Sequence, residues 1–263
     1  NNNSFSNSTQ FVYKINSTTN LMAILSNGFR IPNTDDICKV FSKNDFQVVI
    51  PNNKLLPENS STIELGADIE TLNFINLKIQ LFKTEIKNAI QRREANLNGL
   101  DSILYDGEMM KIMTNQNIGK ATIKGLSFQY NIKASNRFSH NTIINLLKGR
   151  AKNGVPLSHI PPTNIVSDVR YIYKNHSFSL ITHYNDLKKA IEYDLSGVDN
   201  LEEATIVGTP SWYTISLKYR CVIEKNLIFI IGCNNIMDTH YKTFSSGISA
   251  SGRNFTLSLQ SKF

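Results

Sequence analysis

Apolar and polar residues alternate over the last part of the chain. Phe255, Leu257, Leu259 and Phe263 share one face, and the residues between them are mostly polar. A period of two predicts a β-strand with one apolar and one polar face, ending on an aromatic residue. Such a strand fits the closing strand of an outer-membrane β-barrel, which has no free edge. A soluble sheet that ends on a strand is the alternative.

The same alternation recurs at 63–70, 75–81, 165–173 and 213–223. These runs approach the roughly 9–11 residues that a tilted strand needs to cross a bilayer. Strands of soluble proteins are shorter, with a mode of about five or six residues. The pattern therefore predicts an all-β, antiparallel transmembrane barrel. We expect about eleven strands, near residues 8–16, 19–29, 60–70, 73–90, 118–133, 138–149, 163–174, 176–186, 212–224, 226–235 and 253–263.

Short turns and long connections alternate between these strands. The long connections are 30–59, 91–117, 150–162, 187–211 and 236–252. Outer-membrane barrels place short turns at the periplasmic rim and long loops outside. Eleven strands in up-and-down order leave the first and last strands parallel, so they could not close by antiparallel pairing. We therefore expect further strands before Asn1, with residues 1–263 forming the C-terminal part of a larger barrel.

Composition narrows the function classes. No run of eighteen apolar residues predicts a transmembrane helix. The net charge of +7 is spread along the chain rather than clustered, which argues against nucleic-acid binding. Cys38, Cys221 and Cys233 have no metal-ligand spacing, so we expect free thiols and no cofactor. The sequence contains no Ser-His-Asp order and no phosphate-binding glycine loop, so we expect no enzymatic activity.

Several short motifs, in this order, resemble the TonB-dependent outer-membrane receptors in a form common in Bacteroidetes. The strongest are Gly232-Cys-Asn-Asn235-Ile236-Met-Asp238-Thr-His-Tyr241 and Ser246-Gly-Ile-Ser-Ala-Ser-Gly252-Arg253-Asn254-Phe255. Weaker ones precede them, including Gly28-Phe29-Arg30-Ile31-Pro32-Asn33, His159-Ile160-Pro161-Pro162 and Gly208-Thr209-Pro210-Ser211-Trp212-Tyr213. The resemblance extends over nearly the whole chain.

This resemblance implies a barrel of about 22 strands plugged by an N-terminal domain. Residues 1–263 would form its last eleven strands, without the plug or the TonB-coupling segment. The implied partners are the TonB complex, reached through that plug region, outer-membrane lipid, the outer-membrane assembly machinery and a small-molecule ligand such as a ferric chelate. The assembly machinery would recognise Phe255, Leu257, Leu259 and Phe263. The implied cargoes are ferric siderophores, haem and cobalamin.

Charged residues of the outward-facing loops are the candidate ligand-binding residues. Basic side chains there could attract an anionic chelate or haem propionates, or could form salt bridges between loops. Two motifs, around Arg30 and Leu55, resemble those that flank a ligating histidine in haem receptors, but no histidine lies between them. We therefore expect a ferric siderophore or other iron chelate first, haem second and cobalamin third. The candidates are Arg30, Asp35, Asp36, Arg92, Arg93, Arg150 and Lys152.

Other residues have an expected place in such a barrel. Lys78, Lys218 and Arg220 would face the lumen. The apolar phase changes near Gly125, which predicts a bulge or kink. Interface positions, in the membrane head-group region, are expected for the aromatic residues Trp212, Tyr213, Tyr219 and Tyr241.

Three alternatives remain open at this stage. One is another outer-membrane barrel, such as a passive porin or an enzyme barrel. Another is a soluble all-β binding module. The third is the product of a decayed gene, since the chain begins within a barrel pattern and is apolar at the inner positions Ile228 and Ile230.

Overall fold

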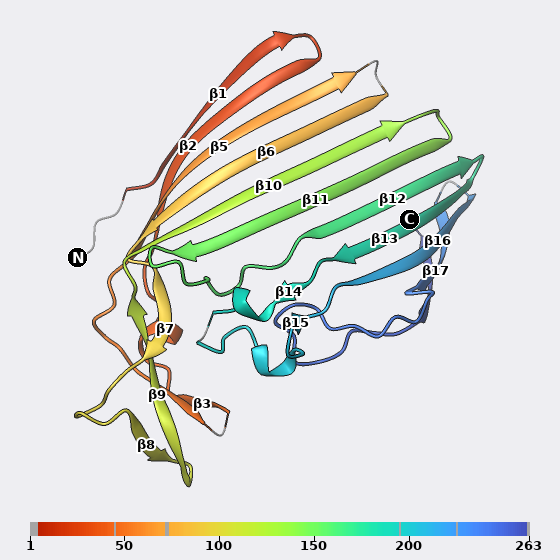
Figure 1. Ribbon diagram of the computed structural model, residues 1–263. Coiled ribbons are helices and arrows are strands. Elements are labelled where there is room, and N and C mark those ends of the chain that lie inside the picture. Colours follow the sequence, from red (N-terminus) through yellow and green to blue (C-terminus); the bar gives the residue numbers. More distant parts are fainter. Residues whose placement is uncertain (1–4, 45, 72–73, 195, 225, 262–263) are drawn as a thin grey trace.

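Long antiparallel strands dominate the computed structural model, which describes residues 5–44, 46–71, 74–194, 196–224 and 226–261. Within these ranges, eleven strands pair in chain order into one curved sheet (Figure 1). Each differs from its predicted range by at most three residues at either end. The strands are β1 (Asn7–Asn16), β2 (Thr19–Arg30), β5 (Glu58–Thr71), β6 (Ile75–Lys87), β10 (Lys120–Lys133), β11 (Phe138–Ala151), β12 (Asn164–Tyr173), β13 (His176–Asn185), β16 (Trp212–Glu224), β17 (Leu227–Asn234) and β18 (Asn254–Ser261).

The register confirms the predicted two-faced pattern. Apolar residues stand directly opposite one another across four strands, from Leu65 through Leu81 and Leu126 to Leu146. Many of these side chains are exposed although they are large and apolar. A soluble sheet would cover such a face, whereas lipid covers it in a membrane barrel. We call this the outward face.

The outward face continues to the C-terminal strand. Phe255, Leu257 and Leu259 all lie on it, opposite Cys233, Ile231 and Phe229 of β17. Phe263, the fourth residue predicted to signal assembly, lies outside the described residues. Cys221 and Cys233 share the outward face out of register with each other, and both are free thiols, as expected.

The sheet has two free edges in the described part of the chain. Pairing runs from β1 to β18, and neither end strand pairs with the other. Because all neighbours are antiparallel, the two edge strands run in the same direction. Among the described residues, no helix is long and apolar enough to cross a membrane.

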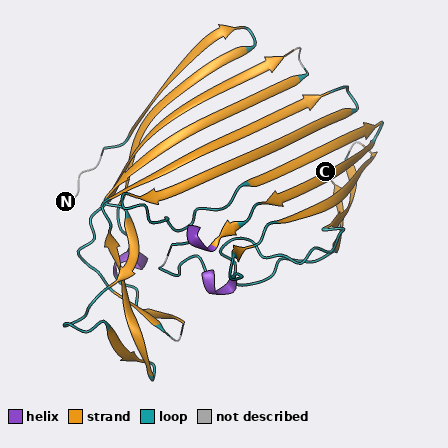
Figure 2. Ribbon diagram, in the orientation of Figure 1, coloured by secondary structure: helices purple, strands orange, loops and turns teal. Residues whose placement is uncertain are grey.

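Two of the predicted loops carry strands of their own, which the sequence analysis missed. They contribute a small sheet that projects from one end of the large one (Figure 2). β4 and β9 pair in parallel there, over a core of Val48, Ile112 and Met113. The added strands are β3 (Phe41–Asn44), β4 (Gln47–Ile50), β7 (Ile90–Glu94), β8 (Ser102–Tyr105) and β9 (Glu108–Asn117).

Short elements complete the loops. The helix α1 (Thr34–Ile37) begins at a capping box formed by Asn33 and Asp36. The 3-10 helices η1 (Ala190–Glu192) and η2 (Leu201–Glu203) lie in one long loop. That loop also pairs β14 (Lys188–Lys189) with β15 (Gly208–Thr209).

The bulge predicted at Gly125 is wrong. β10 pairs with both neighbours without a register shift, and Gly125 stands opposite Phe82 on the inner face. A Cβ at Gly125 would collide with the Phe82 ring and approach Leu147 Cδ2 to 2.9 Å. Glycine is therefore required by the close approach of an aromatic ring, and Ile123 is simply an apolar inward residue.

Candidate functional site

The loop end of the large sheet gathers most of the predicted ligand-binding residues, but two of them, Arg30 and Arg93, form ion pairs within the chain. At the end of β2, Arg30 Nη1 donates to Asp36 Oδ2 at 2.6 Å, and Arg30 Nε donates to Glu58. Asp36 also accepts the backbone N–H of Asn33. These contacts fasten α1 to the strand ends. Asp35 stays exposed in the first turn of α1, where its negative charge interacts favourably with the positive end of the helix dipole.

Arg93 joins two loops that are far apart in the sequence. Its Nη1 donates to Asp194 Oδ1 at 2.9 Å, and its Nη2 donates to Gln91. The Asp194 side chain is completely buried, while that of Arg93 is 25% exposed. Asp194 also accepts the Ser196 hydroxyl. Of the two roles considered for Arg93, the structure therefore shows the salt bridge between loops.

Arg92 lies in a different environment from its neighbour. It is half-buried with its guanidinium over the Phe41 ring, 5.1 Å from the centroid. Arg92 Nε is buried and has no hydrogen-bond partner among the described atoms. Burial lowers the pKa of Arg92, and the charge of Asp194 partly offsets this effect. Arg92 therefore packs against the small sheet rather than facing outside.

A buried polar cluster lies beneath this ion pair. Lys188 Nζ donates to the Ile160 carbonyl at 2.7 Å, and the Tyr193 hydroxyl meets Thr209 Oγ1 at 2.5 Å. Burial lowers the pKa of Lys188, which Glu192 and Asp199 partly counter. Burial also raises the pKa of Tyr193. These contacts tie Lys188 to the preceding loop and join Tyr193 to Thr209 within the 187–211 loop.

Asp199 anchors the preceding loop to the same cluster. Its carboxylate accepts the His159 backbone N–H at 3.0 Å and lies 3.1 Å from His159 Nδ1. Burial raises the pKa of Asp199, while the hydrogen bond from His159 acts in the opposite direction. The sequence analysis missed this carboxylate, because nothing in its local sequence shows that it would be buried.

Beside the cluster, an aromatic pocket of about 250 Å³ opens between the loops. Trp212 and Tyr241 form its wall, with ring centroids 4.1 Å apart. His240 lines it and lies 2.9 Å from Ser249 Oγ through Nε2. Lys242, also in the lining, pairs with Glu203 at 3.0 Å. Flat aromatic walls with an imidazole at the edge suit a planar, partly apolar ligand.

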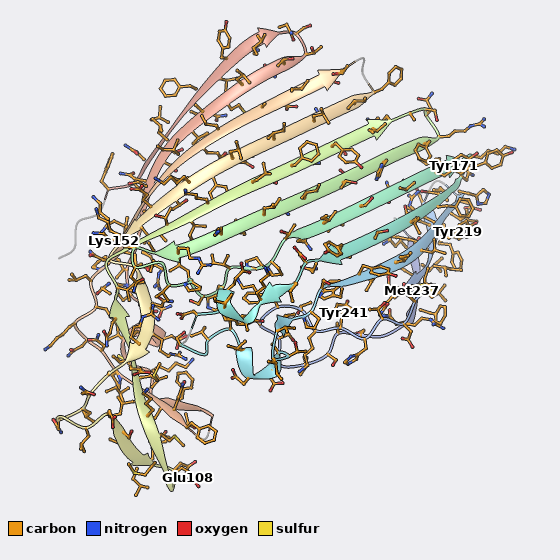
Figure 3. The ribbon with its side chains drawn as sticks, viewed as in Figure 1. Glu108, Lys152, Tyr171, Tyr219, Met237 and Tyr241 are labelled. Carbon is orange, nitrogen blue, oxygen red and sulfur yellow. The ribbon has the colours of Figure 1, made fainter. Side chains whose placement is uncertain are left out.

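This pocket corrects two predicted interface aromatics. Trp212, the first residue of β16, is 8% exposed and packs on Tyr241 of the loop after β17, so neither lies at the membrane interface. Tyr213 and Tyr219 do lie on the outward face. Figure 3 shows Tyr219 near Tyr171, at the turn end of the sheet, and Tyr241 beneath the loop end of β16. The chain's single tryptophan, next to Pro210-Ser211, was the one signal that could have marked the pocket.

Arg150 and Lys152 do not join the loop cluster in a ligand site. Arg150 Nη1 donates to the Gly154 carbonyl at 3.2 Å, which closes its own turn. Lys152 is exposed where β11 ends, at the loop end of the sheet (Figure 3). By strand alternation both share the outward face with Lys148.

The inner face carries the polar residues expected there. Lys78 lies on the inner face, 3.7 Å from Asp68, and Lys218 and Arg220 share that face on β16. Within the described residues, no group of three or more His, Cys, Asp or Glu side chains could hold a metal ion.

Comparison with known proteins gives the family context. A family model described as "TonB dependent receptor-like, beta-barrel" matches residues 1–236. The chain is 26% identical to the hemoglobin and hemoglobin-haptoglobin-binding protein A of Haemophilus influenzae, over 87% of this chain and 22% of that protein. It is also 26% identical to hemoglobin-binding protein A of the same organism, over 96% of this chain and 29% of that protein.

Solved structures share the fold. The copper transporter OprC superposes with a TM-score of 0.78 at 14% identity, over 98% of this chain and 39% of that one. The ferric enterobactin receptor PfeA of Pseudomonas aeruginosa gives 0.75 at 18% identity, over 98% and 40%. The chain thus spans less than a third of the curated relatives it matches and about two fifths of these structures.

Proposed function

Because the chain belongs to the TonB-dependent receptor family, whose barrels sit in the bacterial outer membrane, we propose that it forms part of a receptor importing haem from a haem-carrying protein. Members of this family are transporters rather than enzymes. Residues 1–263 would supply eleven strands of a larger barrel. Uptake would be driven by TonB, acting on a plug domain in another part of the receptor. The Bacteroidetes form of the family stays a prediction.

One observation carries the choice of cargo. Three relatives from Haemophilus influenzae that align with 85–96% of this chain carry hemoglobin binding in their names, one of them with the qualifier "Probable". The aromatic pocket supports the choice by its chemistry, because Trp212 and Tyr241 pack on each other in its lining and the His240 imidazole beside them carries a nitrogen that is a common iron ligand. The expectation of a ferric siderophore first rested partly on Arg30, Arg92 and Arg93, and Arg30 and Arg93 are occupied by internal ion pairs.

The test is growth of a strain that lacks the receptor gene and carries the full-length gene on a plasmid. Each culture receives one source only: haemoglobin, free haem, a ferric siderophore from a panel, or cobalamin. We expect growth on haemoglobin and haem. Growth restored only by a ferric siderophore, or only by cobalamin, would contradict the proposal.

The pocket is tested on the purified full-length receptor. His240→Ala should shift the Soret band of bound haem, since the imidazole would no longer reach the iron. Trp212→Ala should weaken haem binding about tenfold by removing the ring on which Tyr241 packs in the pocket lining. Met237→Ala, an exposed position in the same loop, is the control and should bind as wild type. Unchanged spectra and affinity in both pocket variants would place the haem site elsewhere.

A further inference from the structure

Two tight turns lie between β7 and β9, in the segment that forms the far part of the projecting sheet. Their central residues are Asn98-Gly99 and Asp106-Gly107, and all four have a positive φ, between 52° and 85°. This is the geometry of type I′ turns, which Asn-Gly and Asp-Gly favour. The second turn joins β8 to β9 where the projecting sheet lies farthest from the large sheet, next to Glu108 (Figure 3). Each turn therefore holds the residues beside it in a fixed arrangement.

A pair of exposed apolar side chains borders each turn. Leu97 and Leu100 exchange two backbone hydrogen bonds across the first turn, at 2.8 and 3.0 Å. Leu104 stands directly opposite Met109 beside the second turn, and their exposed fractions are 70% and 64%. Met110, on the other face of β9, is buried in the small core. The two exposed pairs are thus not part of that core, and we call Leu97, Leu100, Leu104 and Met109 the apolar tips.

Acidic residues surround the apolar tips. Residues 95–110 contain Asp101, Asp106 and Glu108 and no Lys, Arg or His, although the whole chain has a net charge of +7. All three are exposed, and none forms an ion pair with a residue in the described ranges. The tips therefore combine apolar side chains with a local negative charge, opposite in sign to the net charge of the chain.

This combination narrows the kind of partner. Lipid is not available to the tips, because the projecting sheet extends from the loop end away from the lipid-covered strands (Figure 2). A small ligand would need a concave site, whereas these turns protrude. A second copy of the chain would bring like charges together at the tips. A protein surface with an apolar centre and a basic rim is complementary in both respects.

We propose that the apolar tips dock the protein part of the haem carrier, through an apolar patch bordered by basic side chains, while the aromatic pocket takes the haem. This inference rests on the proposed function. The ion pair from Arg93 of β7 to Asp194 ties the projecting sheet to the 187–211 loop, which lines part of the aromatic pocket. A carrier docked on the tips would therefore be held in a defined position relative to the pocket. Free haem would bypass the tips.

The test compares binding of haemoglobin and of free haem to the purified full-length receptor. Leu104→Ser with Met109→Ser should weaken haemoglobin binding about tenfold or more, because apolar side chains at the centre of an interface carry most of its binding energy. Free haem should bind with wild-type affinity and an unchanged Soret band. Asp101→Asn with Asp106→Asn and Glu108→Gln should slow haemoglobin association, most at low ionic strength.

The matched control is Ile191→Ser with Met237→Ser, at exposed apolar positions in two other loops. It should bind haemoglobin as wild type. Wild-type haemoglobin affinity in the Leu104 and Met109 variant, or an equal loss in the control, would overturn the docking proposal alone. Loss of free-haem binding in the tip variant would overturn it too, by assigning the tips to the haem site. Failure of the wild-type receptor to bind either haemoglobin or haem would overturn the proposed function and this inference with it.

A labelling experiment checks that the tips are accessible in the whole receptor. Leu104→Cys, in a receptor with Cys38→Ser to remove the exposed native thiol, should react on intact cells with a maleimide that does not cross membranes. Haemoglobin should slow this reaction about tenfold, and free haem should not. An unreactive Leu104→Cys would show that another part of the receptor covers the tips, and equal protection by haemoglobin and free haem would show no separate docking of the protein. Either result would overturn the proposal.

Discussion

Arg93 and Asp194 show how single residues hold the loop end together. The carboxylate is completely buried, and its charge is balanced by one guanidinium and one hydroxyl. Removing one member of a buried ion pair leaves an uncompensated charge, which costs more than the pair contributes. The exposed Lys242–Glu203 pair nearby has no such dependence, because water can solvate either partner.

Arg93→Met should therefore destabilise the 187–211 loop by about 2–4 kcal/mol, less than a fully buried pair because Arg93 is partly exposed. The measurement is limited proteolysis of the loop in the full-length receptor. Arg93→Met with Asp194→Asn should recover part of the loss, since no charge is then buried alone. Lys242→Met is the control. The free energy of loop opening derived from its cleavage rate should change by less than about 1 kcal/mol. Equal sensitivity of the two single variants would contradict the assignment.

Asp199 gives the loops a pH dependence of defined sign. Its pKa is raised in the folded loop, mainly by burial, so the folded form holds its proton to higher pH than the unfolded form. This contribution to stability is present below the ordinary aspartate pKa of about 3.9 and is lost as pH rises through the raised value. Protection of the amides in 157–163 and 196–204, measured against the exchange rate of an unstructured peptide at the same pH, should fall over that window. Asp199→Asn should remove the slope, and an unchanged slope would assign it to another group.

At the scale of elements, the projecting sheet folds on a core of its own. Val48 and Ile112 are fully buried, yet the strands around them are short and belong to two different loops. A sheet of this size has few other core contacts to offset the free energy lost when a cavity is created. The large sheet does not depend on this core, because lipid covers and stabilises its outward face.

Ile112→Ala should cost about 2–5 kcal/mol and unfold the projecting sheet alone. Hydrogen exchange should then lose protection in 41–50 and 102–117, while the receptor keeps its heat-modifiable migration in gels. Leu104→Ala, at a position 70% exposed on β8, is the matched control and should leave protection unchanged. Loss of barrel migration in the Ile112 variant would show that the two sheets fold as one unit.

The close contact between Gly125 of β10 and the Phe82 ring of β6 leads to a second prediction at this scale. Gly125→Ala should slow assembly of the receptor and destabilise it by about 1–3 kcal/mol, because the added methyl overlaps the Phe82 ring. Combining it with Phe82→Ala should restore assembly. Gly28→Ala, where a Cβ meets only Ser60 Oγ at 3.3 Å, is the control. Failure of the Phe82 change to rescue would indicate a backbone requirement instead.

At the scale of the whole molecule, the two free edges of the large sheet determine whether residues 1–263 can close into a barrel. β1 and β18 run in the same direction and pair with no strand of the described chain on their outer sides. Unpaired backbone groups in lipid cost several kcal/mol each. Residues 1–263 expressed alone should therefore not give a monodisperse, heat-modifiable monomer in detergent. Such a monomer, seen by gel migration and light scattering, would mean that eleven strands can close by themselves.

The sequence by itself determined the eleven strands, their order and the face that each presents to lipid. The strands and their faces follow from a period of two along each strand, and five of the ten connections are turns short enough to join only neighbouring strands. It could not determine the loop end. The pairing of β4 with β9, the Arg93–Asp194 ion pair and the Trp212–Tyr241 wall join residues from separate loops. The lysines of β6, β10 and β11 are visible in the sequence, but only the register of the three strands shows that they stand opposite one another. Electrostatic interaction depends on distance in space, which the sequence does not give.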